Sequence, residues 1–400
     1  MAGPLEGIRV LELGRNVAGP FAGKLLADHG ADVLKVEPPG GDPARLAGPF
    51  PGDEPHPEKS GLFLHLNTSK RSVTLDPSTA DGAALVRRLA ANVDIVIEDF
   101  APGQAEQWGF GWQTLSEGRD QLVMASITPF GQSGPYRDYL GTEITLQAIG
   151  GPLRNTGHGE KQPLKLGGHV AHYHAGVTTA FAVMAAQLRA ELGGEGDYID
   201  ISVYQCQAGF RDRRTVFLTA ASYTGMARAR PVPGSRLATG VRRCRDGWVN
   251  VLAGRNIDTL LILIERPDLF ARVEPDVPPP QQPPEVTEVL EAAYREWLME
   301  HDKLDVIARA QELRILCGAV LTIEDLLTDP HYRDRGVWDT IDHPVAGAFE
   351  YPGRSLIMSA SPRPDPRPAP LLGEDNEAVY IDELGIDRDE LARLNAAGVV

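Results

Sequence analysis

Short apolar runs alternate with helix-like segments over the first hundred residues of the chain. Ile8–Leu13 and Ala31–Glu37 have the length and apolar character of strands, and a Gly/Pro/Asn turn and the helix-like Phe21–His29 lie between them. A second helical pattern, Asp81–Ala91, precedes another buried-looking strand, Asp94–Glu98. Strand–helix–strand alternation of this kind predicts βαβ units in a doubly wound α/β core.

The pattern continues through the middle of the chain and then changes. Leu122–Ile127 and Tyr198–Val203 predict two further strands, and the Ala-rich Gly176–Ala190 predicts a long helix. Beyond about residue 225, Arg228–Gly240 is rich in Arg, Pro and Gly and predicts a linker. Val277–Pro284 predicts an extended, Pro-rich loop. We therefore expect a large α/β domain that is interrupted by a smaller one.

Composition narrows the class of protein. The 400 residues are 42% hydrophobic and 24% charged, which predicts a soluble globular protein of about two domains. The net charge of −16 argues against binding to nucleic acid or to an anionic membrane. Three widely spaced cysteines predict no disulfide framework and a reducing, cytoplasmic location. We also expect neither a signal peptide nor a membrane span.

The first turn has the outline of a dinucleotide-binding unit. A Gly/Pro turn, Gly14–Pro20, precedes a helix, and the following strand ends in an acid, Glu37. However, Gly14 and Gly19 are five residues apart, and no G-x-G-x-x-G is present. A nicotinamide-dependent oxidoreductase is therefore only a weak alternative.

Several motifs resemble those of the family III CoA-transferases, also called the CaiB/BaiF or formyl-CoA transferase family. They stand in order along nearly the whole chain: ELGRNVAGP (12–20), GADVLKVEPP (30–39), LNTSKRS (66–72), VIEDFAPG (96–103), SITPFGQSGPY (126–136), GEGDYIDIS (194–202) and DPHYRDRG (329–336). The resemblance implies a large Rossmann-like domain with a parallel sheet, built from 1–222 and 331–400. It also implies a small α+β domain with linkers over 223–330, and an interlocked dimer.

The same resemblance implies binding of CoA or acyl-CoA and transfer of CoA between carboxylic acids, or related thioester chemistry. The phosphates of CoA need basic side chains and backbone N–H donors. The residues that the resemblance assigns to CoA are Val17, Ala18, Leu66, Asn67, Thr68, Lys70, Arg71, Asp99, Phe100, Ala101 and Arg137. Two positions that are basic in family members are Pro38 and Gln107 here, and Arg45 is a candidate substitute.

The segment LGGHVAHYHAG (166–176) has His172 where the family has its catalytic aspartate. That aspartate forms an anhydride with the acyl group and then a thioester with CoA, so the chemistry uses a carbonyl carbon of the enzyme. Imidazole has none, which leaves open whether this chain is an enzyme. His172 is a hydrogen-bonding pocket residue, a general base or nucleophile, or a metal ligand with His169 and His174. The i, i+3, i+5 spacing does not place all three on one helix face, and we expect no metal.

Glu143 is a candidate carboxylate for the site. It lies in a segment where related racemases carry a histidine, which is Thr142 here, so that type of proton transfer is disfavoured. Glu143 is either a catalytic group or a charge at a helix N-terminus. The glycine-rich loop of the family is reduced to Leu252–Arg255. Two hypotheses remain: a CoA-transferase with altered chemistry, or a non-catalytic subunit that pairs with an Asp-bearing homologous subunit.

Overall fold

The computed structural model describes residues 3–209, 219–226, 230, 236–274, 276–353, 355–361 and 364–400. The chain divides into two compact units. The first unit comprises 1–154, 165–227 and 334–400, and the second comprises 155–164 and 228–333. Most of the predicted linker over 228–240 lies outside the described residues, and its last two residues begin a strand of the second unit.

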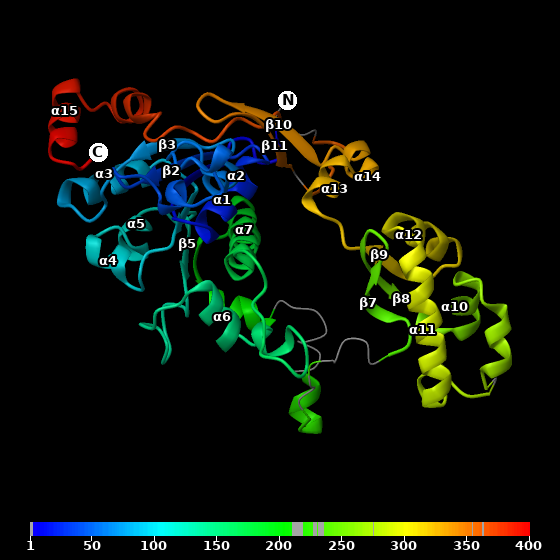
Figure 1. Ribbon diagram of the computed structural model, residues 1–400. Coiled ribbons are helices and arrows are strands. Elements are labelled where there is room, and N and C mark those ends of the chain that lie inside the picture. Colours follow the sequence, from blue (N-terminus) through cyan, green and yellow to red (C-terminus); the bar gives the residue numbers. More distant parts are fainter. Residues whose placement is uncertain are drawn as a thin grey trace. The chain divides into compact units, whose positions relative to one another are not determined.

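A six-stranded parallel sheet forms the centre of the first unit (Figure 1). Its strands in chain order are β1 (Arg9–Leu13), β2 (Asp32–Glu37), β3 (Arg71–Thr74), β4 (Ile95–Glu98), β5 (Val123–Thr128) and β6 (Asp197–Ser202). In space the order is β3-β2-β1-β4-β5-β6, and each neighbouring pair is parallel. The predicted α/β fold with a parallel sheet is confirmed. The strand order reverses between β1 and β4, which creates a topological switch point.

Alternate residues of the strands pack on opposite faces of this sheet. Leu11 and Val96 belong to one hydrophobic core, and Val10 and Ile95 belong to the other. Because both faces are covered, the strands read as nearly continuous apolar runs. The helices of the first unit include α1 (Ala18–Ala27), α2 (Gly61–Leu66), α3 (Ala80–Ala90), α4 (Gln104–Trp108), α5 (Trp112–Leu115), α6 (Glu143–Ile149), α7 (Val170–Glu191), α8 (Val203–Gly209) and α15 (Arg388–Ala396).

The two core layers use different helices. Side chains of α3 and the C-terminal α15 fill the first core, and α1 and α7 fill the second. A hairpin of β10 (Trp338–His343) and β11 (Gly347–Pro352) also belongs to the first unit. The chain thus returns to the first unit after it has formed the second.

The second unit has its own antiparallel sheet and its own core. The strands are β7 (Thr239–Cys244), β8 (Gly247–Leu252) and β9 (Cys317–Ala319). The helices are α10 (Ile257–Leu263), α11 (Pro284–Glu300), α12 (Lys303–Glu312), α13 (Ile323–Thr328) and α14 (Pro330–Asp334). The last residue of α14, Asp334, is where the first unit resumes. The reduced glycine loop forms a 3₁₀ turn in which a Cβ on Gly254 would lie 1.8 Å from the Leu237 carbonyl oxygen.

Some predicted boundaries differ from the structure. Helix α1 begins at Ala18, because Gly19 and Pro20 fit a first helical turn, where N–H groups have no partner in the helix. Helix α7 begins at Val170, before the predicted start at Gly176. Within the Pro cluster, part of the predicted extended loop is a 3₁₀ turn over Pro279–Gln281, and α11 starts at Pro284.

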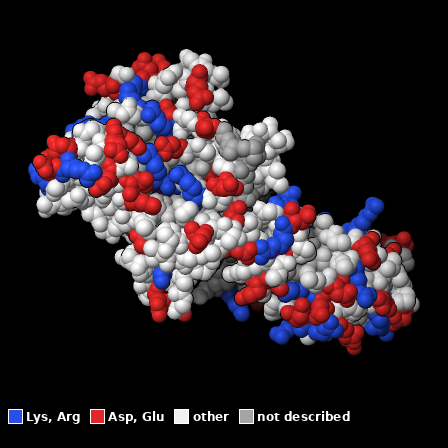
Figure 2. All heavy atoms as spheres, turned by 90° about the horizontal axis from the view of Figure 1, so that it is seen from above, with Lys and Arg blue, Asp and Glu red and all other residues white. Residues whose placement is uncertain are grey.

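Charged groups of both signs are interspersed on the face drawn in Figure 2, with uncharged surface between them. The acidic excess of the chain is therefore not gathered into one block on that face. Within the described ranges, every helix is too short or too polar to cross a bilayer.

Candidate active site at the sheet switch point

The turn after β1 and the end of β4 meet at the switch point. Leu13 is level with Glu98 in the parallel register, so Arg15 and Asp99 extend from the same edge of the sheet. Gly14 and Gly19 close the turn tightly, because a Cβ on either would lie 2.8 Å from the Cα of the other. Ligands of open α/β sheets bind at this place, beyond the carboxyl ends of the strands.

A cavity of about 400 Å³ lies there, and we call it the switch-point cavity. Its lining comes from the β1 turn, the ends of β4 and β5, the first turn of α7, the 3₁₀ turn that begins at Pro43 and the start of α8. The lining residues are Arg15, Asn16, Val17, Ala18, Pro43, Asp99, Ile127, Thr128, Pro129, His172 and Val203. Four residues predicted from the sequence, Val17, Ala18, Asp99 and His172, are thus brought together although they are up to 155 residues apart. The sequence did not single out Arg15, Asn16 or Thr128, although their position just after a strand or at its end was a usable signal.

His172 and Glu143 form a hydrogen-bonded pair beside the cavity. The Nδ1 atom of His172 lies 2.7 Å from Glu143 Oε2. Glu143 is the first residue of α6, and its carboxylate also accepts hydrogen bonds from the Ala171 N–H at 2.8 Å and from Gln147 Nε2 at 2.6 Å. The carboxylate therefore also caps the N-terminus of α7, where a negative charge is favourable.

These contacts keep Glu143 ionised. Burial opposes its ionisation, but the hydrogen bonds from His172, the Ala171 N–H and Gln147 outweigh that effect and lower the pKa of Glu143 to about 2. An ionised carboxylate can only accept, so the hydrogen of the pair is on Nδ1 of His172. In the neutral ring Nε2 is then the basic nitrogen, as in a carboxylate–histidine pair that orients a general base.

Glu143, His169 and His172 also form the one cluster of possible metal ligands in the described ranges, with donor atoms within 4.8 Å of one another. His174, the third histidine of the motif, is not a member. Both Glu143 oxygens already accept N–H groups, and Nδ1 of His172 points to Glu143. The arrangement therefore suits a hydrogen-bonded pair better than a metal ion, which would have to replace those bonds.

Asp99 is the acid among the cavity-lining residues. Its Oδ2 accepts the Arg15 N–H at 2.7 Å, and the Arg15 Nε lies 4.0 Å from Oδ1. Burial raises the pKa of Asp99 to about 7, although the Arg15 N–H and guanidinium oppose the shift. The preceding Glu98 is more deeply buried, and burial raises the pKa of its carboxyl to about 8.

The predicted basic partner Lys70 belongs instead to a buried ion cluster. Its Nζ contacts Glu12 Oε2 at 2.7 Å, the Pro20 carbonyl at 2.8 Å and Asn67 Oδ1 at 2.9 Å. One ion-pair partner and two hydrogen-bond acceptors from the protein thus surround the ammonium group. Burial lowers the pKa of Lys70 to about 8, and Glu12 opposes this shift.

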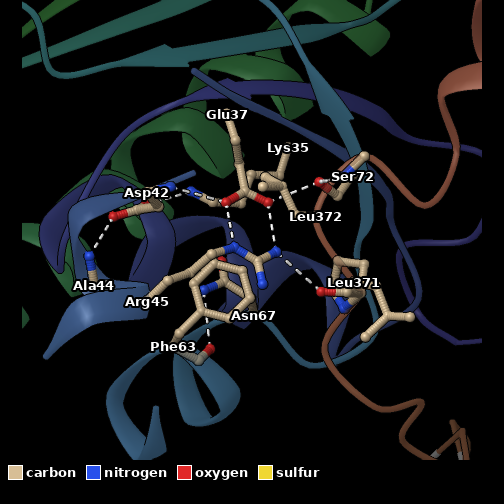
Figure 3. Close-up of polar contacts among 12 residues, drawn as sticks. Lys35, Glu37, Asp42, Ala44, Arg45, Phe63, Asn67, Ser72, Leu371 and Leu372 are labelled. Atoms are coloured by element: carbon tan, nitrogen blue, oxygen red, sulfur yellow. Dashed lines mark hydrogen bonds and ion pairs between the residues drawn. The ribbon is translucent and has the colours of Figure 1, made fainter. Parts of the chain in front are cut away.

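Arg45 and Lys35 complete the ion cluster (Figure 3). The Arg45 guanidinium binds both oxygens of Glu37, at 2.7 and 2.8 Å, and lies 3.6 Å above the Phe63 ring. Lys35 Nζ pairs with Asp42 at 2.8 Å. Burial would lower the pKa of Lys35, but Asp42 and Glu12 outweigh it and raise that pKa. Arg45 is thus occupied within the protein rather than available to replace a phosphate partner.

The other predicted CoA contacts lie outside the cavity lining. Leu66, Asn67 and Thr68 are buried, and Thr68 Oγ1 accepts a hydrogen bond from Lys24 at 2.6 Å. Of the remaining residues, Phe100 is buried, Ala101 is exposed, Arg71 pairs with Asp32 and Glu383, and Arg137 bonds the carbonyls of Pro102 and Gln132.

Comparisons with known proteins point to one family over nearly the whole chain. The family model of CoA-transferase family III matches residues 5–376. A succinyl-CoA–D-citramalate CoA-transferase of Chloroflexus aurantiacus is 31% identical, over 99% of this chain and 98% of its own length. The alpha subunit of a succinyl-CoA–L-malate CoA-transferase of the same organism is 29% identical, over 99% and 92%. The crystal structure of a CaiB/BaiF family protein from Brucella suis superimposes with a TM-score of 0.82 and 28% identity, and covers 96% of this chain and 100% of that one.

Proposed function

Since this chain belongs to CoA-transferase family III, we propose that it binds an acyl-CoA with the thioester in the switch-point cavity and transfers CoA to a second carboxylic acid. The observation that carries the proposal is the cavity itself, which joins the β1 turn to His172 at the ligand-binding edge of the sheet. Of the residues assigned to CoA by resemblance, Val17, Ala18 and Asp99 line this cavity.

Arg15 is the cationic side chain that would bind the carboxylic acid substrate. Its side chain is 42% exposed and lies over the Phe100 ring, with the guanidinium carbon 5.5 Å from the ring centre. A guanidinium binds a carboxylate through two parallel hydrogen bonds. Arg15 would hold the carboxylate of the donor or acceptor acid and keep it near the thioester.

His172 acts as a base toward the CoA thiol. Its Nε2 is the basic nitrogen of the neutral ring, because Glu143 fixes the hydrogen on Nδ1. The thiolate, rather than the thiol, attacks a carbonyl carbon. A base beside the sulfur would keep released CoA as the thiolate until it attacks again, within each half of the transfer.

The test is an assay of the full chain with succinyl-CoA, since the names of both relatives include that donor. We expect a new acyl-CoA, detected by mass spectrometry, when D-citramalate, L-malate or another short dicarboxylic acid is supplied. If free CoA is released at the same rate with and without an acid and no new acyl-CoA forms, the chain hydrolyses the thioester and does not transfer CoA.

A variant pair tests the role of the histidine. Glu143→Gln presents an N–H₂ group to N–H donors and no longer fixes the His172 tautomer, so we expect turnover to fall about 100-fold. Glu195→Gln, at an exposed position beyond α7, is the matched control and should retain wild-type turnover. Equal turnover of the two variants would show that the hydrogen bond between Glu143 and His172 has no part in the mechanism.

A second candidate function is that of a subunit in a mixed complex. Two features support it: His172 stands where the resemblance places the family's aspartate, and one relative is named as an alpha subunit. Co-expression with a homologous subunit that carries the aspartate tests it. A mixed complex that is active, together with an inactive isolated chain, would establish this function in place of the first.

A further inference from the structure

CoA transfer through the protein requires a carbonyl carbon of the protein itself, because an enzyme–CoA thioester must form. His172 has no such carbon. Glu143 has one, but its carboxylate is engaged by the N–H groups of Ala171, Gln147 and the His172 ring. Among the described residues that line the switch-point cavity, Asp99 is the sole carboxylic acid.

The position of Asp99 suits a reacting group. It follows the last residue of β4, so a rigid central strand of the sheet holds its backbone. One oxygen, Oδ2, is anchored by the Arg15 N–H at 2.7 Å, and a Cβ on Gly19 would lie only 3.4 Å from it. The other oxygen, Oδ1, has the Arg15 guanidinium as a charged neighbour at 4.0 Å. The side chain is 14% exposed, so it is shielded but still reachable from the cavity.

We propose that Asp99 is the nucleophile that carries the acyl group and then CoA, in place of the carboxylate missing at position 172. The inference rests on the proposed CoA transfer and names the residue that would perform it. The carboxylate would thus have moved from the α7 side of the cavity to the β4 side.

The reaction balances without an external proton or oxidant. Oδ1 of Asp99 attacks the thioester carbonyl carbon, the C–S bond breaks, and CoA leaves as the thiolate while a mixed anhydride forms. The thiolate then attacks Cγ of Asp99, the Cγ–Oδ1 bond breaks, and the acid leaves as its carboxylate with that oxygen. Asp99 now carries CoA as a thioester.

The second half repeats these steps in reverse. A carboxylate oxygen of the acceptor attacks Cγ, expels the thiolate and forms a second anhydride. The thiolate attacks the acyl carbon of the acceptor, which yields the new acyl-CoA and restores the Asp99 carboxylate. One carboxylate enters and one leaves, so the net charge is unchanged.

The electrostatic setting agrees with this role. Burial raises the pKa of Asp99 to about 7, so the carboxylate is more basic than a solvated one and is ionised above neutral pH. Arg15 is close enough to stabilise negative charge while the acyl carbon is tetrahedral. Transfer should therefore decrease as the pH falls through about 7, since the protonated acid is not a nucleophile.

The experiment maps the covalent intermediate in the wild-type chain. The protein is incubated with succinyl-CoA at pH 8 without an acceptor and is then treated with hydroxylamine, which converts an activated carboxyl to a hydroxamate and leaves free carboxylates unchanged. We expect the hydroxamate on the peptide that contains Asp99, and none when succinyl-CoA is omitted.

Two variants complete the test. Asp99→Asn keeps an oxygen for the Arg15 N–H but cannot form the intermediate, so we expect CoA transfer to fall by at least about 1,000-fold with CoA binding retained. Asp94→Asn is the matched control. Asp94 also accepts a backbone N–H, that of Arg9 at 2.8 Å, but it precedes β4 and so lies at the end of the strand opposite to Asp99. This variant should keep wild-type transfer.

The failures are distinguishable. If the wild-type chain transfers CoA but the hydroxamate forms at another residue, or Asp99→Asn retains a tenth of the activity, the Asp99 proposal is overturned and the proposed function stands. If the wild-type chain neither binds nor transfers CoA, both the proposed function and the Asp99 proposal fail. Should Asp99→Asn not fold, the wild-type peptide map alone decides.

Discussion

Lys70 lies in the segment that resembles a CoA-contacting motif, yet the chain itself surrounds its ammonium group. It forms an ion pair with Glu12 and donates hydrogen bonds to the Pro20 carbonyl and to Asn67. Removal of one partner from a buried ion pair is costly, because the other charge loses its compensation. At the residue scale this contact set indicates a role in folding rather than in phosphate binding.

Lys70→Met should therefore lower the free energy of unfolding by about 3 kcal/mol, because Glu12 then keeps only Lys35 as a charged partner. Urea unfolding measures the change. The double variant Glu12→Gln/Lys70→Met should recover part of it, because no charge is left uncompensated. Lys161→Met, at an exposed position, is the control. A large loss of CoA affinity at unchanged stability would instead return Lys70 to the ligand site.

The sequence could identify part of the site because some contacts are local and others are not. The family resemblance assigned Val17, Ala18 and Asp99 to CoA, and they lie in the segments that follow β1 and β4, at the ligand-binding edge of the sheet. The pairing of His172 with Glu143 joins residues 29 positions apart through the packing of α6 and α7, and no periodicity reports that. Likewise, the partners that occupy Lys70 and Arg45 become evident only when the strands are aligned.

At the scale of elements, the sheet was predictable because its strands are apolar on both faces and are separated by recognisable turns. Helix starts were harder to predict. In α1 the residues Gly19 and Pro20 suggest a turn, yet they lie in the first helical turn, where N–H groups have no partner within the helix. The start of α7 depends on a cap from Glu143, which is remote in sequence.

The turn after β1 should tolerate no side chain at Gly19. A Cβ there would lie 2.8 Å from the Cα of Gly14 and 3.4 Å from Asp99 Oδ2, and backbone atoms cannot move aside easily. We expect Gly19→Ala to cost about 1–3 kcal/mol in urea unfolding and to reduce CoA transfer further, because it displaces the turn that holds Asp99.

Gly40→Ala is the matched control, since Gly40 is exposed and a Cβ there would meet nothing within 4 Å. Its stability and activity should stay within about 0.5 kcal/mol and twofold of the wild type. Equal behaviour of the two alanine variants would show that the contact of Gly14 with Gly19 does not shape the turn.

At the scale of the whole molecule, α7 presents an apolar stripe that the described chain does not cover. Val177, Phe181, Leu188 and Leu192 follow one another at intervals of four or seven residues and are 37–79% exposed. The opposite side of the same helix fills the second core of the sheet. Large apolar side chains aligned on one helix face are typical of a protein–protein interface.

We expect this stripe to be buried between subunits, as the resemblance to interlocked dimers implies. Light scattering after gel filtration should give a mass twice the 43.3 kDa of one chain. Each chain carries a net charge of −16, so two copies repel one another and need buried apolar area to associate. Phe181→Asp places a charge in the stripe and should return the protein to the mass of a single chain.

The control for this variant is Ile262→Asp, which adds the same charge at a residue of the second unit that is 57% exposed, where Phe181 is 75% exposed. Its mass should equal that of the wild type. A wild-type chain that is monomeric at micromolar concentration but associates with an Asp-bearing homologue through α7 would point to the mixed complex. Because the stripe lies on the helix that carries His172, loss of the interface should also lower CoA transfer.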